Sequence, residues 1–111
     1  MSETQLIAGD VGQLEIILDT PDDSSDSDPV TVCCHPHPLH GGSMQNKVVH
    51  ILAKSFLPLG SKVVRFNFRG VGQSQGEFAH AVGEQADLLA VVQWCRKKWP
   101  DAPIWLAGFS F

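Results

Sequence analysis

Apolar and polar residues follow one another along the chain with the spacing of strands and helices. Residues 13–20 (QLEIILDT) are apolar and β-branched enough for a strand, and residues 4–8 are expected to pair with them as a hairpin. Residues 30–34 (VTVCC) form a short apolar run between turn residues, which is typical of a strand buried on both faces of a parallel sheet. Residues 63–68 (VVRFNF) and 104–107 (IWLA) predict two more buried strands of this kind.

Between the first two of these buried runs, residues 44–57 have the period of an amphipathic helix. Ser43 is the expected N-cap, and Pro58 and Gly60 are expected to end the helix. The apolar positions that fall on one face are Met44, Val48, Ile51, Leu52, Phe56 and Leu57.

A second helix is expected between the glycine-rich turn at 69–76 (RGVGQSQG) and Pro100. Glu84 and Asp87 fall in its first turn and three bases in its last, which suits the helix dipole. Its inner face would be formed by Leu88, Val91, Val92, Cys95 and Trp99. The order strand, helix, strand, helix, strand predicts a parallel sheet with helices on both faces, a three-layer α/β/α sandwich.

The composition is that of a soluble globular domain or part of one, with 111 residues, 43% hydrophobic residues and a net charge of -4. The apolar runs are much shorter than the roughly 20 residues that cross a bilayer, and the first ten residues lack the pattern of an export signal. Three cysteines, two of them adjacent, do not make a disulfide framework. We therefore expect a cytoplasmic protein that does not act at a membrane.

Charge is distributed unevenly along the chain. Residues 1–28 hold eight acids and no base, and residues 21–29 (PDDSSDSDP) are expected to form an acidic loop without the spacing of a calcium site. The charged residues between 29 and 76 are all basic: Lys47, Lys54, Lys62, Arg65 and Arg69. A nucleic-acid face is one interpretation, but these bases are isolated and the pI is about 5.6. We expect them on a solvated surface, with no nucleic-acid partner.

The last four residues, Gly-Phe-Ser-Phe, place a serine directly after the last predicted strand. In a nucleophile elbow, a strand leads into a sharp turn that carries the serine, and glycines two residues away relieve crowding. Gly108 supplies the first such glycine for Ser110. Ligands of open α/β sheets bind at the carboxyl ends of the strands. Ser110 is therefore the candidate nucleophile, and an ordinary turn serine is the alternative.

The segment HPHPLHGGSMQNK follows the first buried strand and is a candidate oxyanion loop. Pro36 and Pro38 have no N–H to donate, which leaves His37 and Leu39 as the candidate backbone donors. The second donor of an elbow is the amide after the nucleophile, here that of Phe111. Loss of one donor in such a site costs about 10²–10³ in rate.

Four motifs occur in one order: HPHPLHGGSMQNK, RFNFRGVGQSQG, a Gly-Glu pair three residues ahead of Asp87, and WLAGFSF. In this combination the chain resembles a bacterial α/β-hydrolase family of small, dienelactone-hydrolase-like serine hydrolases, from about residue 10 onward. The resemblance implies an eight-stranded, mostly parallel sheet. Residues 1–111 would be the N-terminal half of one such domain, truncated after the fifth strand.

The resemblance also implies a Ser–His–Asp triad whose Asp and His follow the elbow, beyond residue 111. We therefore expect a serine hydrolase that cleaves small carboxylic esters or related acyl compounds through an acyl-enzyme, without a cofactor. The 111-residue chain alone is expected to be inactive. The oligomeric state stays open.

Two alternatives to a serine hydrolase remain. His35, His37 and His40 have the spacing of a metallo-β-lactamase-type zinc motif, but Leu39 stands where that motif has an acid. A zinc-dependent metallohydrolase is therefore one alternative, and a non-catalytic binding protein with a hydrolase fold is the other. Ser74 lacks an elbow, and the glycines around it lack the spacing of a dinucleotide-binding loop.

Overall fold

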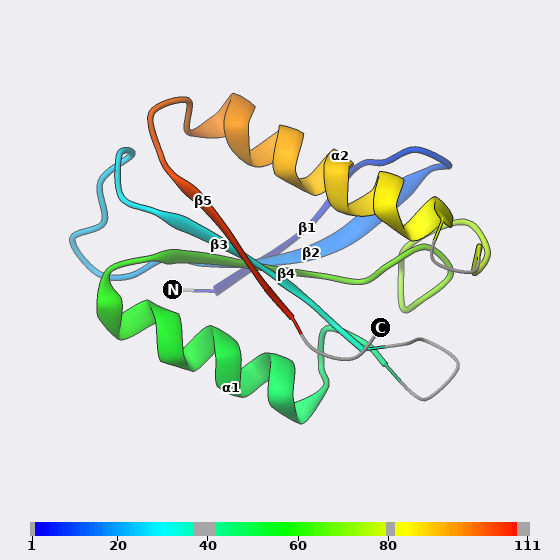
Figure 1. Cartoon of the computed structure of the whole chain (residues 1–111), viewed down its shortest axis with the longest axis horizontal. Coiled ribbons are helices and arrows are strands. Elements are labelled where there is room, and N and C mark those ends of the chain that lie inside the picture. Colours follow the sequence, from blue (N-terminus) through cyan, green and yellow to red (C-terminus); the bar gives the residue numbers. More distant parts are fainter. Residues whose placement is uncertain (1, 37–41, 80–81, 109–111) are drawn as a thin grey trace.

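A five-stranded sheet with the order β1-β2-β4-β3-β5 forms the middle layer of the chain (Figure 1). The computed structural model describes residues 2–36, 42–79 and 82–108. The strands are β1 (Ser2–Ala8), β2 (Gln13–Asp19), β3 (Val30–Cys34), β4 (Lys62–Phe66) and β5 (Ile104–Gly108). β2 runs antiparallel to both β1 and β4, whereas β3 runs parallel to β4 and β5. The predicted hairpin and the parallel strands are thus confirmed.

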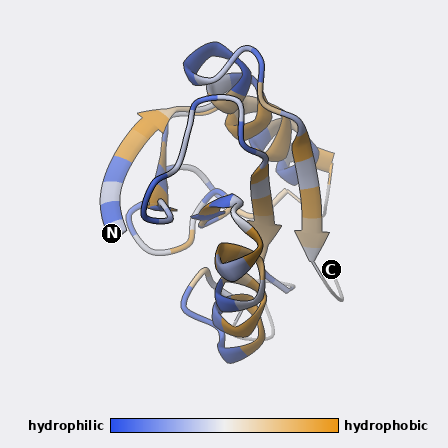
Figure 2. Cartoon of the chain, turned by 90° about the vertical axis from the view of Figure 1, so that its left-hand side faces the viewer, coloured by the Kyte–Doolittle hydropathy of each residue, from blue (hydrophilic) through white to orange (hydrophobic). Residues whose placement is uncertain are grey.

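Helices α1 (Lys47–Phe56) and α2 (Val82–Lys98) cover opposite faces of this sheet (Figures 1 and 2). The predicted start of the first helix is wrong by three residues. Asn46, not Ser43, is the N-cap, and its side-chain oxygen accepts a hydrogen bond from the Val48 amide at 2.9 Å. The predicted end is confirmed, because a 3₁₀ turn, η2 (Leu57–Leu59), follows α1 and Gly60 ends it in a left-handed conformation (φ 87°).

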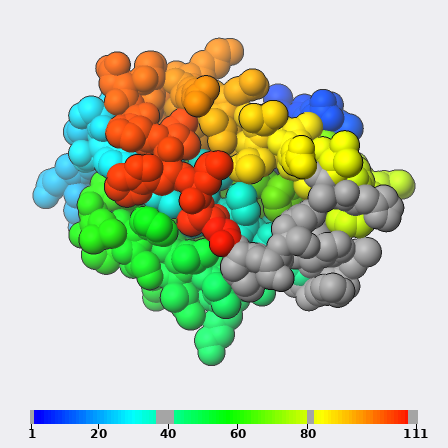
Figure 3. Space-filling model, in the orientation of Figure 1, coloured from blue at the N-terminus to red at the C-terminus, as the bar shows by residue number. Residues whose placement is uncertain are grey.

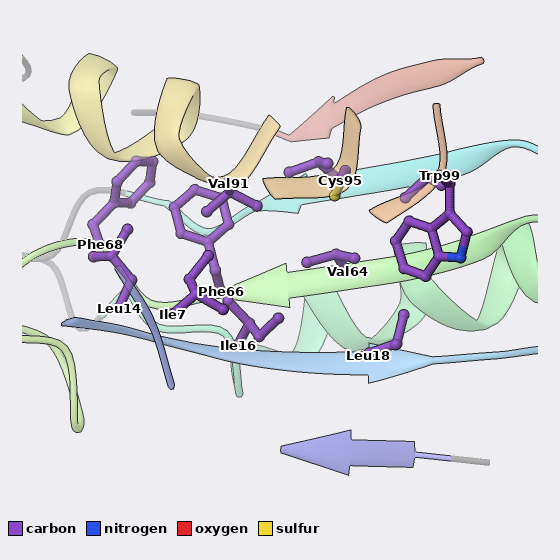
Figure 4. Packing of buried hydrophobic residues seen from close by; sticks show 12 residues of the cluster. Ile7, Leu14, Ile16, Leu18, Val64, Phe66, Phe68, Val91, Cys95 and Trp99 are labelled. Carbon is purple, nitrogen blue, oxygen red and sulfur yellow. The ribbon is translucent and has the colours of Figure 1, made fainter. Parts of the chain in front are cut away.

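Side chains that alternate along the strands fill one core on each face of the sheet. The core under α2 contains Phe66 and Phe68, whose rings pack edge to face with centroids 4.8 Å apart (Figure 4). Its other buried members are Ile7, Leu14, Ile16, Leu18, Val30, Val32, Val64, Val91, Cys95 and Trp99. The smaller core under α1 contains Cys33, Val49, Ala53 and Val63.

Three of the bases expected on a solvated surface are instead buried: Lys62, Arg65 and Arg69 are 2%, 7% and 6% exposed. Lys62 and Arg65 are buried because their strand, β4, has a strand on each side and a helix over each face. Arg69 follows β4 and is buried by its contacts with Gly83 and Asp87 of α2. Each buried charge is paired with protein groups, as burial requires. Arg65, for example, donates to the Asp19 carboxylate at 3.2 Å.

The expected burial of residues 104–107 is also wrong in part. Among the described residues, β5 is an edge strand paired with β3 alone, and Trp105 and Leu106 are 44% and 59% exposed. Figure 3 shows this strand at the molecular surface, between α1 and α2. Within the described residues, no helix is long and apolar enough to cross a membrane.

Candidate active site

The carboxyl ends of β3 and β5 lie side by side at one edge of the sheet, where Cys34 pairs with Gly108. A Cβ built on Gly108 would lie 3.1 Å from the Cys34 Cβ and 3.3 Å from its carbonyl oxygen, so a side chain there would fit only if Cys34 moved by a few tenths of an ångström. Burial raises the pKa of the Cys34 thiol to about 11, which keeps it protonated and unreactive at neutral pH.

The expected catalytic residues come directly after these strand ends. Ser110 and Phe111 follow Gly108, and His37 and Leu39 follow the end of β3, but all four lie outside the described residues. The roles of these four residues therefore stay predictions. The described residues show only where the two strands end from which they follow.

His35 is fully buried at the end of β3 and connects this strand to β4. The backbone amide of Phe68 donates to Nε2 at 3.0 Å, and Nδ1 lies 2.7 Å from the Pro36 carbonyl oxygen. Because Nε2 accepts, Nδ1 must carry the proton that is donated to Pro36. Burial lowers the pKa of His35, although the bond to Pro36 opposes this shift, so the imidazole is neutral.

This arrangement argues against the zinc interpretation of the histidine motif. Both ring nitrogens of His35 already have protein partners, which leaves no lone pair for a metal ion. In the ranges 2–36, 42–79 and 82–108, no group of three His, Cys, Asp or Glu side chains could hold a metal. The other two histidines of the motif, His37 and His40, lie outside these ranges.

Asn67, directly after β4, is buried and makes several hydrogen bonds. The sequence predicted it only as part of a buried apolar strand. Its side-chain oxygen accepts from the Met44 amide at 2.8 Å, and its side-chain nitrogen donates to the Glu15 carboxylate at 2.8 Å. Its backbone amide donates to the Glu15 carbonyl at 3.0 Å, and its carbonyl accepts from the Ser74 hydroxyl at 2.6 Å. A polar residue within the run VVRFNF was the signal that could have identified it.

Ser74 has a structural role. Its buried hydroxyl donates to the Asn67 carbonyl and accepts from the Glu15 amide at 2.9 Å, so the oxygen is committed to the turn after β4. In the same turn Gly70, Gly72 and Gly76 have positive φ values of 78°, 54° and 97°. The turn lines an open pocket of about 510 Å³ together with Gly42, which precedes α1.

Arg69 ties the β4 end to the first turns of α2. Its guanidinium donates to both oxygens of the fully buried Asp87 carboxylate at 2.9–3.2 Å, and its backbone amide donates to the same group at 2.9 Å. The guanidinium also reaches the Gly83 carbonyl at 2.6 Å and Asp10 at 3.2 Å. These hydrogen bonds, above all those to Asp87, raise the pKa of Arg69.

From the sequence, Asp87 and Glu84 were expected only to suit the dipole at the start of the helix, but both side chains are buried. Asp87 lies four residues before Val91 and eight before Cys95, on the stripe that faces the sheet. Glu84 accepts a hydrogen bond from the Ala79 amide at 2.9 Å, ahead of the helix. Helical spacing was therefore the signal that could have placed Asp87 on the inner face.

Comparison with known proteins identifies the family. Residues 10–111 match the model of the X-Pro dipeptidyl-peptidase (S15) family. The chain belongs to this family.

Solved structures show that this S15-family chain has an α/β-hydrolase fold. An α/β serine hydrolase homologue from Coxiella burnetii is 53% identical, with a TM-score of 0.91, and the match covers 97% of this chain and 51% of that one. An α/β serine hydrolase without a lid, from Xanthomonas campestris, is 49% identical with the same TM-score, over 98% and 50% of the two chains.

A further relative is an uncharacterized protein of Rickettsia prowazekii (strain Madrid E), 45% identical over 89 residues, which are 79% of this chain and 37% of that protein. The S15-family chain thus spans about half the length of the solved structures it matches, and less of this relative. The resemblance to α/β-hydrolases that the sequence motifs indicated is confirmed.

Proposed function

We propose that this chain is the N-terminal half of a serine hydrolase that cleaves carboxylic esters or related acyl compounds, with Ser110 as the nucleophile. The observation that carries the proposal is the pairing of Cys34 with Gly108 at the carboxyl ends of β3 and β5. Because of this register, the segment with Ser110 and the segment with His37 and Leu39 leave the sheet from adjacent positions. A nucleophile and oxyanion donors need this proximity. The serine hydrolases among the solved relatives support the same chemistry.

In the proposed reaction, the Ser110 hydroxyl oxygen attacks the carbonyl carbon of the substrate, and its proton passes to a histidine in the second half of the protein. The amides of Phe111 and of His37 or Leu39 stabilise the oxyanion. The bond to the leaving group breaks as that group takes the proton, and water then hydrolyses the acyl-enzyme to release the acid and regenerate the serine. This cycle needs no cofactor. We also propose a cytoplasmic location, in keeping with the three free cysteines.

The test is active-site labelling of the full-length hydrolase, a protein about twice as long as this chain that contains it as its N-terminal half. A fluorophosphonate should phosphonylate one peptide, which peptide mapping assigns to Ser110 and not to Ser74. Ser110→Ala should abolish both labelling and turnover of p-nitrophenyl acetate. Ser55→Ala is the matched control, because Ser55 is an exposed serine on α1 and its loss should leave both unchanged. Undiminished labelling of Ser110→Ala would contradict the proposal.

A peptidase is the second candidate, because the matched family is named for X-Pro dipeptidyl-peptidase. The same acyl-enzyme chemistry would then act on an amide bond. Comparing an Ala-Pro p-nitroanilide with p-nitrophenyl acetate separates the two. A Ser110-dependent kcat/KM that is higher for the p-nitroanilide would favour the peptidase.

A further inference from the structure

We propose that His35 and Asn67 are positioning residues that fasten the two ends of the segment between β3 and α1, and thereby orient the oxyanion donors within it. The inference rests on the proposed function, because that function assigns the donors to His37 or Leu39. Neither positioning residue contacts the reacting atoms. Both act through the backbone of the segment between them.

The first fastening is at the start of the segment. The His35 Nε2 accepts from the Phe68 amide at 3.0 Å, and its Nδ1 lies 2.7 Å from the carbonyl oxygen of Pro36, the residue that enters the segment. The ring is 1% exposed and its edge packs against the Phe68 ring, with centroids 4.8 Å apart. The imidazole therefore fixes the direction in which the chain leaves β3 relative to the end of β4.

The second fastening is at the far end of the segment. The Met44 amide donates to the side-chain oxygen of Asn67 at 2.8 Å, and the Met44 side chain is buried. This contact holds the residues just before α1 against the sheet. It also accounts for the late start of the helix at Lys47, because Met44 is used for contacts with the sheet and not as part of the helix.

Both fastenings converge on consecutive residues, Asn67 and Phe68, at the end of β4. That anchor is itself rigid, because Asn67 is held by Glu15 through the backbone amide and the side-chain nitrogen, and by the Ser74 hydroxyl through its carbonyl. Oxyanion donors lower the barrier only if they are oriented before the reaction, so that no reorganisation is needed in the transition state. Contacts that hold Pro36 and Met44, the two ends of the segment, at one point of the sheet would serve this requirement.

The role predicts a kinetic signature. Misplaced oxyanion donors weaken binding of the transition state more than binding of the substrate, so kcat falls while KM stays nearly constant. A displacement of about 1 Å is enough to lower the rate about 10²-fold. A loss of folding alone would instead lower the amount of active enzyme without changing its pH profile or its KM.

The experiment compares two amides at position 35 in the full-length hydrolase. His35→Gln can place its side-chain oxygen where Nε2 accepts from Phe68, whereas the shorter side chain of His35→Asn reaches only the Nδ1 position. We expect His35→Asn to lower kcat about 10²-fold, with KM unchanged, and His35→Gln to restore most of it. Asn67→Leu, which removes the acceptor for Met44, should behave like His35→Asn.

Thr31→Val is the matched control. Thr31 lies near the other end of the same strand, β3, and shares a buried hydrogen bond of 2.8 Å with Ser61. Its replacement removes one buried hydrogen bond without touching either fastening, so active-site-titrated kcat should not change. Equal kcat values for folded His35→Asn, Thr31→Val and wild type would overturn the proposal, as would a rise in KM at constant kcat.

A second measurement needs no variant. The ¹⁵N spectrum of the histidine rings in the full-length hydrolase should show His35 as the neutral tautomer protonated at Nδ1, with Nε2 accepting from Phe68. A proton on Nε2 would overturn the positioning role. These results are separate from those on the proposed function, because activity that survives Ser110→Ala contradicts the nucleophile assignment whatever the state of His35.

Discussion

His35 is buried on all sides, yet each of its ring nitrogens has a backbone partner, and Asn67 satisfies four hydrogen-bonding groups in the same region. Such groups are costly to bury unless they are fully paired, and removing one partner leaves the other group unsatisfied at a cost of about 1–3 kcal/mol. At the scale of single residues, the carboxyl ends of β3 and β4 are therefore organised by buried polar side chains whose hydrogen-bonding groups are paired.

A pH dependence of stability follows from the lowered pKa of His35. The unfolded chain, with an ordinary histidine pKa of about 6.5, binds a proton at higher pH than the folded protein does. Stability from this group is therefore complete above pH 6.5 and is lost as the pH falls below it, with a slope of at most about 1.4 kcal/mol per pH unit.

The measurement is urea unfolding of wild type and His35→Gln in the full-length hydrolase from pH 7.5 to 5. The difference between their free energies of unfolding should be constant above pH 6.5 and should shift against wild type below it. A difference that is independent of pH over the whole range would show that His35 has the same pKa in the folded and unfolded states.

At the scale of elements, the Arg69–Asp87 pair attaches α2 to the end of β4 and, through Asp10, to the turn after β1. α2 begins with Val82, which is 77% exposed, followed by Gly83 and the buried Glu84, so its first residues bury little apolar surface. Its apolar contacts with the sheet come further along, from Val91 and Cys95. The ion pair therefore fixes the N-terminal half of the helix, where apolar packing is sparse.

Breaking this pair should destabilise the full-length hydrolase strongly. Arg69→Met leaves the Asp87 carboxylate buried without its cation, and we expect a loss of about 3–5 kcal/mol in the free energy of unfolding. The double variant with Asp87→Leu should lose much less than the sum of the two single variants, because it leaves no unpaired charge. Urea unfolding of the four proteins gives the coupling energy. Additive losses would mean that the two side chains do not depend on each other.

At the scale of the whole molecule, the sheet ends in an exposed apolar strand. β5 has no strand beyond it among the described residues, and Trp105 and Leu106 are 44% and 59% exposed. Unpaired edges that carry apolar side chains favour association with other strands. The net charge of -4 offers little protection here, because eight of the acids lie in the first 28 residues.

We expect the 111-residue chain, expressed alone, to self-associate through β5 and to have no measurable esterase activity. Size-exclusion chromatography should show species larger than the 12.1 kDa monomer. Leu106→Lys should shift the chain toward the monomer, because a charged edge strand resists pairing. Leu89→Lys on α2 is the matched control, since both leucines are 59% exposed, and it should have no such effect. A monodisperse wild-type monomer with Ser110-dependent turnover would contradict both expectations.

The sequence by itself determined the order and type of the elements. Continuous apolar runs identified β3 with its observed bounds, and helical periods identified both helices. The face predicted for the first helix was wrong in part, because Val48 and Ile51 are exposed whereas Val49 and Ala53 are buried. The motifs also indicated the fold family, whereas the roles of Ser110 and of the oxyanion donors stay predictions. Tertiary structure decided the burial of Arg69 and Asp87, the shortening of α1 and the exposure of β5. Each of these depends on partners far away in the chain, such as Phe68 for His35, and no local pattern can specify which distant group satisfies a buried polar atom.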